Sequence, residues 1–328
     1  MSKLLEIKDL YVQYNTDESV VHALNGFSLS MNKGDSLGLV GETGAGKTTM
    51  ALSILRLLPE QVGEITGGSI HYNGIDILHA DKHQMRKLRG AEISMIFQDP
   101  MTSLNPLMTV GDQIKEVLVL HFPEMSKFEQ EKRVDEILNL VGIPAKRKKE
   151  YPHQFSGGMK QRIVIAMALI AEPKLLLADE PTTALDVTIQ AQILALMKEL
   201  KRQYDSAMIL ITHDLGIVAE FCDSVAVVYA GMVIESGTVE QVFTRTFNHP
   251  YTSGLFHCIP ELTVDTDRLT PIPGYMADPT NLPKGCKFAD RCKYCKEICK
   301  TEEPIAVEVE EDHFIKCHFP VSGGTQHE

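Results

Sequence analysis

The sequence has no apolar run long enough to cross a bilayer, and its acidic side chains outnumber its basic ones. The longest apolar run, Ile163–Ala171, falls well short of the roughly 20 residues that a transmembrane helix needs. The first residues, MSKLLEIKDL, lack the apolar core of a secretory signal. With 32 Lys and Arg against 44 Asp and Glu, the net charge of −12 argues against a protein that wraps nucleic acid. These absences predict a cytoplasmic protein that cannot itself form a channel.

Cysteine is scarce over most of the chain and concentrated near its end. Of the seven cysteines, five lie between Cys286 and Cys317. In a reducing compartment, such clustering favours metal binding over disulfide bonds. The 328 residues, 44% hydrophobic and 23% charged, allow one sizeable domain with an extension, or two domains.

A glycine-rich segment, GETGAGKT at 41–48, fits the phosphate-loop pattern G-x-x-x-x-G-K-S/T. It follows a predicted buried strand at 35–40 and precedes a predicted helix at 47–58, which disfavours an unrelated glycine-rich turn. Backbone N–H groups and the helix dipole of such a loop bind phosphate oxygens. We expect Lys47 to reach the β- and γ-phosphates of ATP and the Thr48 hydroxyl to bind Mg²⁺. The predicted ATP-binding residues of this segment are Gly41, Thr43, Gly44, Ala45, Gly46, Lys47, Thr48 and Thr49.

Polar side chains also follow three further predicted strands. Gln98, the pair Asp179 and Glu180, and His213 each come at the end of a short apolar segment. Strand ends are where α/β sheets place their ligands, and adjacent carboxylates there are costly unless they face a cation or a reacting water. We expect Asp179 and Gln98 to bind Mg²⁺, Glu180 to act as general base and His213 to bond the γ-phosphate. Taken alone, a single Gln or His at such a position is usually structural.

One tyrosine and one Ser-Gly-Gly segment are further candidates for nucleotide contact. Tyr14 closes the first of two antiparallel strands predicted over 4–32, where its ring could stack on a nucleobase or pack on the sheet. Ser156, Gly157 and Gly158 precede an apolar helix, which is typical of an anion-binding helix N-terminus or of a plain N-cap.

In this order, the motifs resemble the ATP-binding subunit of an ABC transporter over roughly residues 4–260. The resemblance implies an α/β ABC ATPase cassette at 1–257. Its parts would be a P-loop parallel-sheet core, an antiparallel β subdomain and a helical subdomain at about 100–170. A small Pro/Cys-rich extension at 258–328, which we expect to be a linker followed by a metal-stapled unit, would complete the chain.

The resemblance also implies a head-to-tail dimer of ATPase subunits. ATP held by one subunit would then be contacted in trans by four residues of the other, Ser156, Gly157, Gly158 and Asp186. The commonest family sequence has Leu before the serine and Gln after the glycines, where this chain has Phe155 and Met159. Because the contacts come from Ser156 and backbone N–H groups, we expect the site to remain active.

Several segments resemble the oligopeptide and dipeptide importer branch of this family. They are QDPMTSLNP at 98–106, FSGGMKQR at 155–162, HPYT at 249–252, PIPG at 271–274 and the spacing of the C-terminal cysteines. This implies a D-type ATPase that powers peptide import, with nickel chelates or oligosaccharides as alternative solutes. The implied partners are a second homologous ATPase in a heterodimer, two transmembrane permease subunits and, indirectly, an extracytoplasmic solute-binding protein. The protein would act at the cytoplasmic face of the cell membrane and bind no nucleic acid.

The C-terminal cysteines follow the spacing C-x5-C-x2-C-x3-C-x17-C. Four thiolates suit either zinc or an iron–sulfur cluster, and C-x2-C with a distant cysteine favours zinc by pattern. The resemblance instead implies a 4Fe–4S cluster. Its ligands would be Cys286, Cys292, Cys299 and Cys317. Cys295 falls where the family usually has another residue, so it is either a spare thiol or a replacement for Cys292.

Two other functions fit the motifs less well. A soluble ABC ATPase of DNA repair or of the ribosome would carry long coiled-coil arms or two cassettes, whereas this chain has one cassette and no heptad run. A regulatory metal sensor with an inactive cassette is disfavoured because Lys47, Glu180 and His213 are all present.

Overall fold

The computed structural model describes residues 3–183, 185–244, 247–258 and 271–321. The chain forms two compact units. The helix-rich unit comprises Asn32–Ser36 and His79–Ile211, and the strand-rich unit comprises Lys3–Met31, Leu37–Leu78 and the chain from Thr212 onward. Most of the predicted linker, residues 259–270, lies outside the described residues.

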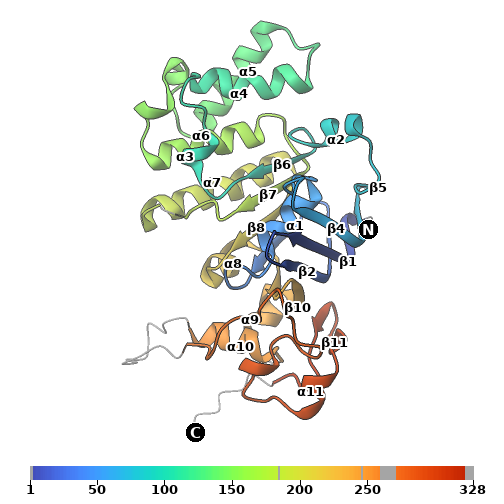
Figure 1. Ribbon diagram of the computed structural model, residues 1–328. Helices are drawn as coiled ribbons and strands as arrows, with labels where there is room; N and C mark the ends of the chain where they lie inside the picture. Colours follow the sequence, from blue (N-terminus) through green and yellow to red (C-terminus); the bar gives the residue numbers. More distant parts are fainter. Residues whose placement is uncertain (1–2, 184, 245–246, 259–270, 322–328) are drawn as a thin grey trace. The chain divides into compact units, whose positions relative to one another are not determined.

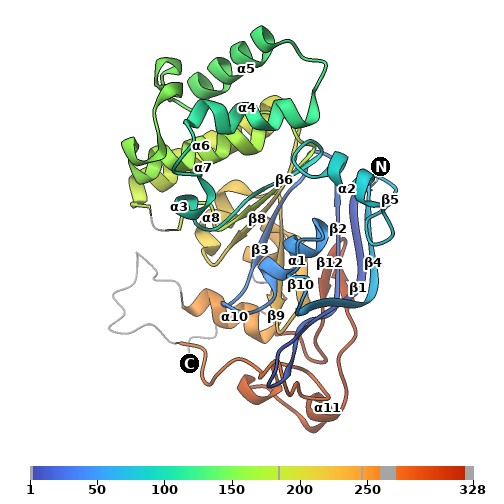
Figure 2. The same ribbon diagram turned by 45° about the horizontal axis from the view of Figure 1, so that its top comes forward.

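An antiparallel sheet with the strand order β2-β1-β4-β5 belongs to the strand-rich unit (Figure 2). Its strands are β1 (Lys3–Asn15), β2 (Val20–Asn32), β4 (Gly63–Tyr72) and β5 (Ile75–Asp76). Asn73 and Gly74 join β4 to β5 with positive φ angles of 47° and 82°, as a type I′ turn requires. The structure confirms the antiparallel strands predicted over 4–32.

A second, mixed sheet of this unit has the strand order β11-β12-β10-β9-β3. Its strands are β3 (Ser36–Val40), β9 (Ser224–Tyr229), β10 (Met232–Thr238), β11 (Val307–Glu310) and β12 (His313–Ile315). Only β3 and β9 pair in parallel, and the other pairs are antiparallel. The helices of the unit are α1 (Lys47–Ile54), α8 (Leu215–Phe221), α9 (Val239–Thr244), α10 (Pro250–His257) and α11 (Glu297–Thr301), with a 3₁₀ turn η3 (Ala289–Arg291).

The cysteine-rich extension is built into this mixed sheet. Strand β12 pairs with β10, with Ile315 opposite Glu235. Phe288 of the extension packs edge-on against Tyr229 and Tyr251, with ring centroids 5.3 and 5.4 Å apart. The described part of the extension therefore buries apolar side chains in the core of the strand-rich unit.

The helix-rich unit contains the parallel strands β8 (Ala207–Thr212), β7 (Leu175–Asp179) and β6 (Ile93–Ile96), in that order. Its α-helices are α2 (Lys82–Leu88), α3 (Pro100–Ser103), α4 (Val110–His121), α5 (Lys127–Leu140), α6 (Gly157–Leu169) and α7 (Val187–Tyr204) (Figure 1). Between α5 and α6 lie two 3₁₀ turns, η1 (Ala145–Lys149) and η2 (Pro152–Gln154).

Local sequence accounts for the helices of this unit. Ser126 and Glu129 form a capping box that starts α5, and Thr109 caps α4. Buried positions recur at helical spacing, with Ile114 and Leu118 on α4 and Val134 and Leu138 on α5. Both helices therefore follow from capping residues and apolar spacing in the local sequence.

Helix α1 is shorter than predicted. It ends at Ile54 because Arg56 adopts a left-handed φ of 49°, and the Leu57 N–H then donates to the Leu52 carbonyl at 2.8 Å. Apolar spacing continues past this point in the sequence, so periodicity alone overestimates the helix. Nowhere in the described ranges does a helix combine the length and apolarity needed to cross a membrane.

Candidate nucleotide site and cysteine pocket

The glycine-rich segment joins the buried strand β3 to helix α1, as its sequence predicts. Gly41 and Gly46 have φ angles of +154° and +102°, and Gly46 is the N-cap of α1. A Cβ atom at Gly41 would lie 2.2 Å from the Val228 carbonyl oxygen, and one at Gly46 would lie 2.6 Å from that of Ala23. Only glycine fits either position, so the loop curls in the way that phosphate binding needs.

The Lys47 ammonium lies inside this loop. Its Nζ atom donates to the carbonyl oxygens of Gly41 at 2.7 Å and Glu42 at 3.0 Å, and the residue is 6% exposed. An ammonium held among loop carbonyls at a helix N-terminus is placed to exchange these bonds for phosphate oxygens. Binding of the β- and γ-phosphates by Lys47 stays a prediction.

Tyr14 lies against the same helix. Its hydroxyl is 3.2 Å from the Thr49 hydroxyl, so β1 and α1 bring together two residues predicted to contact ATP. The ring also lies 3.3 Å from where a Cβ of Gly63 would be, against β4. Stacking of Tyr14 on a nucleobase stays a prediction.

In the helix-rich unit, the predicted catalytic residues lie at the carboxyl ends of β6 and β7. The Gln98 side-chain amide donates to Glu180 Oε2 at 3.0 Å, although the two residues are 82 positions apart. Glu180 has a left-handed φ of 45° and its N–H donates to the Ile211 carbonyl at 2.9 Å. Asp179, the last residue of β7, is 3% exposed. The parallel pairing of β6 with β7 thus brings Gln98 beside Glu180.

Thr183 is a further residue at this carboxylate, and its role was not predicted from the sequence. Its hydroxyl donates to Glu180 Oε2 at 2.9 Å. The available signal was a hydroxyl residue three positions after an acid at a strand end, a spacing common in tight turns. Gln98 and Thr183 together hold the Glu180 carboxylate through one oxygen.

The Ser-Gly-Gly segment begins α6. Ser156 is the N-cap, it is exposed, and its side chain makes no capping hydrogen bond. A Cβ at Gly158 would lie 2.7 Å from Ile189 Cγ2, which accounts for glycine there. Asp186 instead caps α7 by accepting from the Ile189 N–H at 3.0 Å. Ser156 therefore keeps its hydroxyl available at a helix N-terminus, whereas Asp186 has a structural role of its own.

His213 follows β8 and is exposed. The phosphate loop, Tyr14 and His213 belong to the strand-rich unit, and Gln98, Glu180 and the Ser-Gly-Gly segment to the helix-rich unit.

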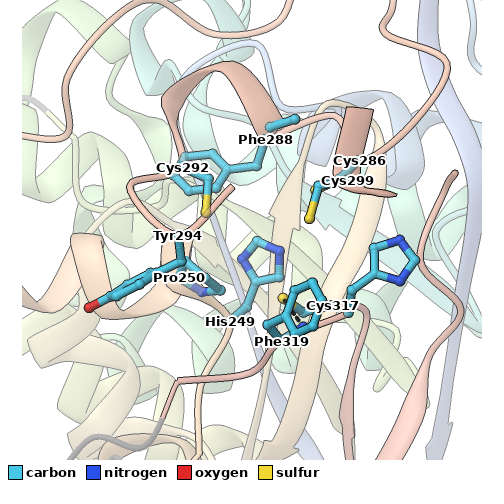
Figure 3. Close-up of a pocket in the computed structure, with 11 residues that line it drawn as sticks. His249, Pro250, Cys286, Phe288, Cys292, Tyr294, Cys299, Cys317 and Phe319 are labelled. Atoms are coloured by element: carbon cyan, nitrogen blue, oxygen red, sulfur yellow. Dashed lines mark hydrogen bonds between the residues drawn. The ribbon is translucent and has the colours of Figure 1, made fainter. Parts of the chain in front are cut away.

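The four cysteines predicted as cluster ligands line one pocket (Figure 3). Its cavity volume is about 10 Å³, enough for one water molecule. The rest of its wall is largely aromatic, with His249, Phe288, Tyr294 and Phe319. Cys295 is absent from this lining and its thiol faces the Lys296 carbonyl oxygen at 3.6 Å.

Burial raises the pKa of the Cys286 thiol to about 11 and that of Cys317 to about 12. The pKa of Cys292 is raised for the same reason. A metal would have to displace these protons, as thiolate ligation requires. Among the described residues, no three or more His, Cys, Asp or Glu side chains are arranged to hold a metal ion. The donor set thus has the chemistry for four-thiolate ligation but not the coordinating geometry.

Comparison with known proteins decides the family. Residues 24–183 match the family model described as ABC transporter, and residues 234–299 match the one described as the C-terminal region of oligopeptide/dipeptide transporters. The oligopeptide transport ATP-binding protein OppD of Bacillus subtilis is 50% identical over 96% of this chain and 88% of its own length. The chain belongs to the ABC transporter ATP-binding proteins.

Other relatives agree with this assignment. The dipeptide transport ATP-binding protein DppD of B. subtilis is 49% identical over 97% of this chain and 95% of its own length. Among solved structures, a dimeric ATP-binding cassette bound to ADP and phosphate has a TM-score of 0.64 and 28% identity. It covers 72% of this chain and 98% of its own chain. The ABC ATPase fold expected from the sequence is confirmed, and the protein is an ATP hydrolase of the ABC type.

Proposed function

We propose that this ABC ATPase powers the import of di- and oligopeptides. The observation that carries the proposal is the similarity to OppD and DppD over at least 96% of the chain, together with the match of residues 234–299 to the C-terminal region of peptide transporters. The same class of importer with a nickel chelate or an oligosaccharide as solute is the alternative. In each case binding and hydrolysis of ATP drive the solute across the membrane.

The proposed ATP site assigns a role to each predicted residue. Lys47 and the backbone of the phosphate loop bind the β- and γ-phosphates, and Tyr14 stacks on the base. Glu180 takes the proton of the attacking water, and the bonds from Gln98 and Thr183 orient its carboxylate. His213 bonds the γ-phosphate. Thr48, Gln98 and Asp179 would hold Mg²⁺, which neutralises charge that develops on the phosphates.

We further propose that two ATPase subunits close head to tail around ATP. The uncapped hydroxyl of Ser156 and the first N–H groups of α6 support a contact with the γ-phosphate held by a partner subunit. Gly157, Gly158 and Asp186 would complete this contact in trans. We expect the partner to be a second, homologous ATPase.

The remaining proposed partners place the protein at the cytoplasmic face of the cell membrane. They are two permease subunits that receive the motion of the ATPase dimer, and a solute-binding protein that acts through them. A pull-down from gently solubilised membranes tests this assembly. Two multi-span permeases and a second ATPase are expected, and soluble partners or nucleic acid alone would favour a soluble ABC ATPase instead.

We propose that the cysteine pocket holds a 4Fe–4S cluster through Cys286, Cys292, Cys299 and Cys317. The presence of four thiols in the lining of one pocket supports it, although these thiols would have to rearrange to coordinate the iron, and zinc is the alternative. Such a cluster would cross-link the cysteine-bearing segments of the extension and so stabilise its fold. Iron and acid-labile sulfide in protein purified without oxygen are the expected result. Zinc alone, in a colourless protein, would contradict the cluster.

A further inference from the structure

A bidentate ion pair connects the cysteine-rich extension to the phosphate loop. Arg291 Nη1 lies 2.7 Å from Glu42 Oε2, and Nη2 lies 2.9 Å from Oε1. The two residues are 249 positions apart. The Arg291 side chain is 6% exposed and that of Glu42 is 30% exposed. This is a largely desolvated, two-bond pair of the kind that fixes geometry as well as charge.

Arg291 is itself held rigidly. Its Nε–H donates to the Pro273 carbonyl oxygen at 2.9 Å, and the guanidinium carbon lies 5.8 Å from the ring centroids of both Tyr229 and Phe288. The hydrogen-bonded Glu42 carboxylate raises the pKa of Arg291 above the already high value of an ordinary arginine, so the guanidinium stays positively charged. The contacts with Pro273, Tyr229 and Phe288 therefore fix the position of the guanidinium beside the phosphate loop.

Glu42 is the point where the phosphate loop is fixed. Its N–H donates to the Tyr251 hydroxyl oxygen at 2.9 Å. Its carbonyl oxygen accepts from Lys47 Nζ at 3.0 Å and from the Ala45 N–H at 3.1 Å. The side chain, the N–H and the carbonyl of one residue are all bonded, and the partners of two of these groups come from outside the loop. A shift of Glu42 therefore moves the backbone that binds phosphate.

We propose that Arg291 is a positioning residue for nucleotide binding, which neutralises the Glu42 carboxylate and fixes the phosphate loop. Without this cation, a carboxylate in the loop would repel the polyanionic phosphates of ATP. The extension then contributes to ATP affinity through one side chain. Because Cys292 of the cysteine pocket is the next residue along the chain, the same turn serves both the pocket and the loop. The inference rests on ATP binding by the cassette and not on the transported solute.

Binding of a fluorescent ATP analogue with Mg²⁺ to the full chain tests the proposal. For Arg291→Met we expect the Kd to rise about tenfold, which corresponds to about 1.4 kcal/mol. Added salt should reduce this rise, because the exposed part of the carboxylate is screened. Arg291→Lys keeps the charge and loses the two-bond geometry, so its Kd should lie between that of the parent and that of Arg291→Met. In steady-state hydrolysis the loss should appear in KM more than in kcat.

Rescue distinguishes neutralisation from a general structural effect. If the loss of ATP affinity comes from the uncompensated Glu42 carboxylate, adding Glu42→Gln to Arg291→Met should restore most of that affinity. Lys287→Met is the matched control, since it removes the ion pair of Lys287 with Glu303 at 3.2 Å within the extension. It should leave the Kd unchanged.

Three results would overturn the proposal. These are a Kd for a folded Arg291→Met protein within twofold of the parent, a double variant no better than Arg291→Met, or an equal loss in Lys287→Met. If Arg291→Met does not fold, Arg291→Lys with and without Glu42→Gln gives the same comparison. Failure of the parent to bind ATP would instead count against the proposed ATP site itself.

Discussion

Replacing Glu180 by glutamine isolates the basicity of this carboxylate from its position. Gln98 and Thr183 both donate to Oε2, at 3.0 and 2.9 Å. The amide oxygen of a glutamine can take the place of Oε2 and keep both bonds, with the amide nitrogen in the place of Oε1. The left-handed backbone at this residue, with φ of 45°, costs the same for Gln as for Glu. The substitution therefore removes the general base while both of these bonds can remain.

General-base catalysis contributes about 10²–10⁴ in rate, so we expect turnover of Glu180→Gln to fall by at least about 10², or about 2.7 kcal/mol. ATP binding should persist, because the phosphate loop is untouched. Phosphate release measures the turnover, and light scattering with ATP, Mg²⁺ and the proposed partner ATPase measures the closed dimer, which should accumulate. The turnover of Thr183→Val should fall about tenfold, which corresponds to the lower end of the free energy of a hydrogen bond to a charged group.

Glu172→Gln is the matched control for this experiment. Glu172 is also an acid with a left-handed φ, of 55°, in the helix-rich unit, and it pairs with Arg133 on the surface. Its substitution should leave turnover unchanged. Turnover of Glu180→Gln close to that of the parent would refute the assignment of Glu180 as the base.

Three further predictions concern the fold and the cysteine pocket. Gly46→Ala should destabilise the protein by more than about 2 kcal/mol in urea unfolding, since overpacking adds to backbone strain. The Cβ atom of alanine at position 74 would meet nothing within 4 Å, so Gly74→Ala should lower the free energy of unfolding by less than Gly46→Ala does. Lysine partners lower the pKa of Glu131 from 4.5 to about 2, so its stabilisation is complete above pH 4.5 and is lost as pH falls toward 2. Acid unfolding followed by circular dichroism should accordingly be less steep in Glu131→Gln, and equal steepness would contradict this. Cys299→Ser should abolish metal loading, measured as iron per chain, whereas Cys295→Ser should leave it unchanged, and the opposite pattern would reassign the ligands.

Local patterns were sufficient to predict some of the helices and strands. Alternating apolar residues predicted β1 and β2, whereas the caps of α4 and α5 became visible only in the structure. The phosphate loop was predictable because each of its special residues has a local reason, such as the positive φ of Gly46 before α1. The end of α1 was predicted wrongly, since the left-handed turn at Arg56 leaves no mark in apolar spacing.

Contacts between distant segments could not be predicted in the same way. Gln98 was expected to bind Mg²⁺, but its bond to Glu180 follows only from the parallel pairing of β6 with β7. Thr183 had no distinguishing pattern beyond its place in a turn. The extension was expected to be a linker followed by a small metal-stapled unit, and the pairing of its strand β12 with β10 was not foreseen. A strand of three residues carries too little periodicity to reveal its partner.

The sequence by itself determined the chemistry of this protein, because phosphate binding needs particular residue types at fixed spacing along one loop. It left open whether Cys292 or Cys295 joins the other three cysteines, and the structure places Cys292, not Cys295, in the lining of their pocket. Only the tertiary structure decided that Arg291 of the extension pairs with Glu42 of the phosphate loop. The energy of such a pair depends on burial and on the approach of two segments 249 residues apart, and neither is encoded in the local order of residues.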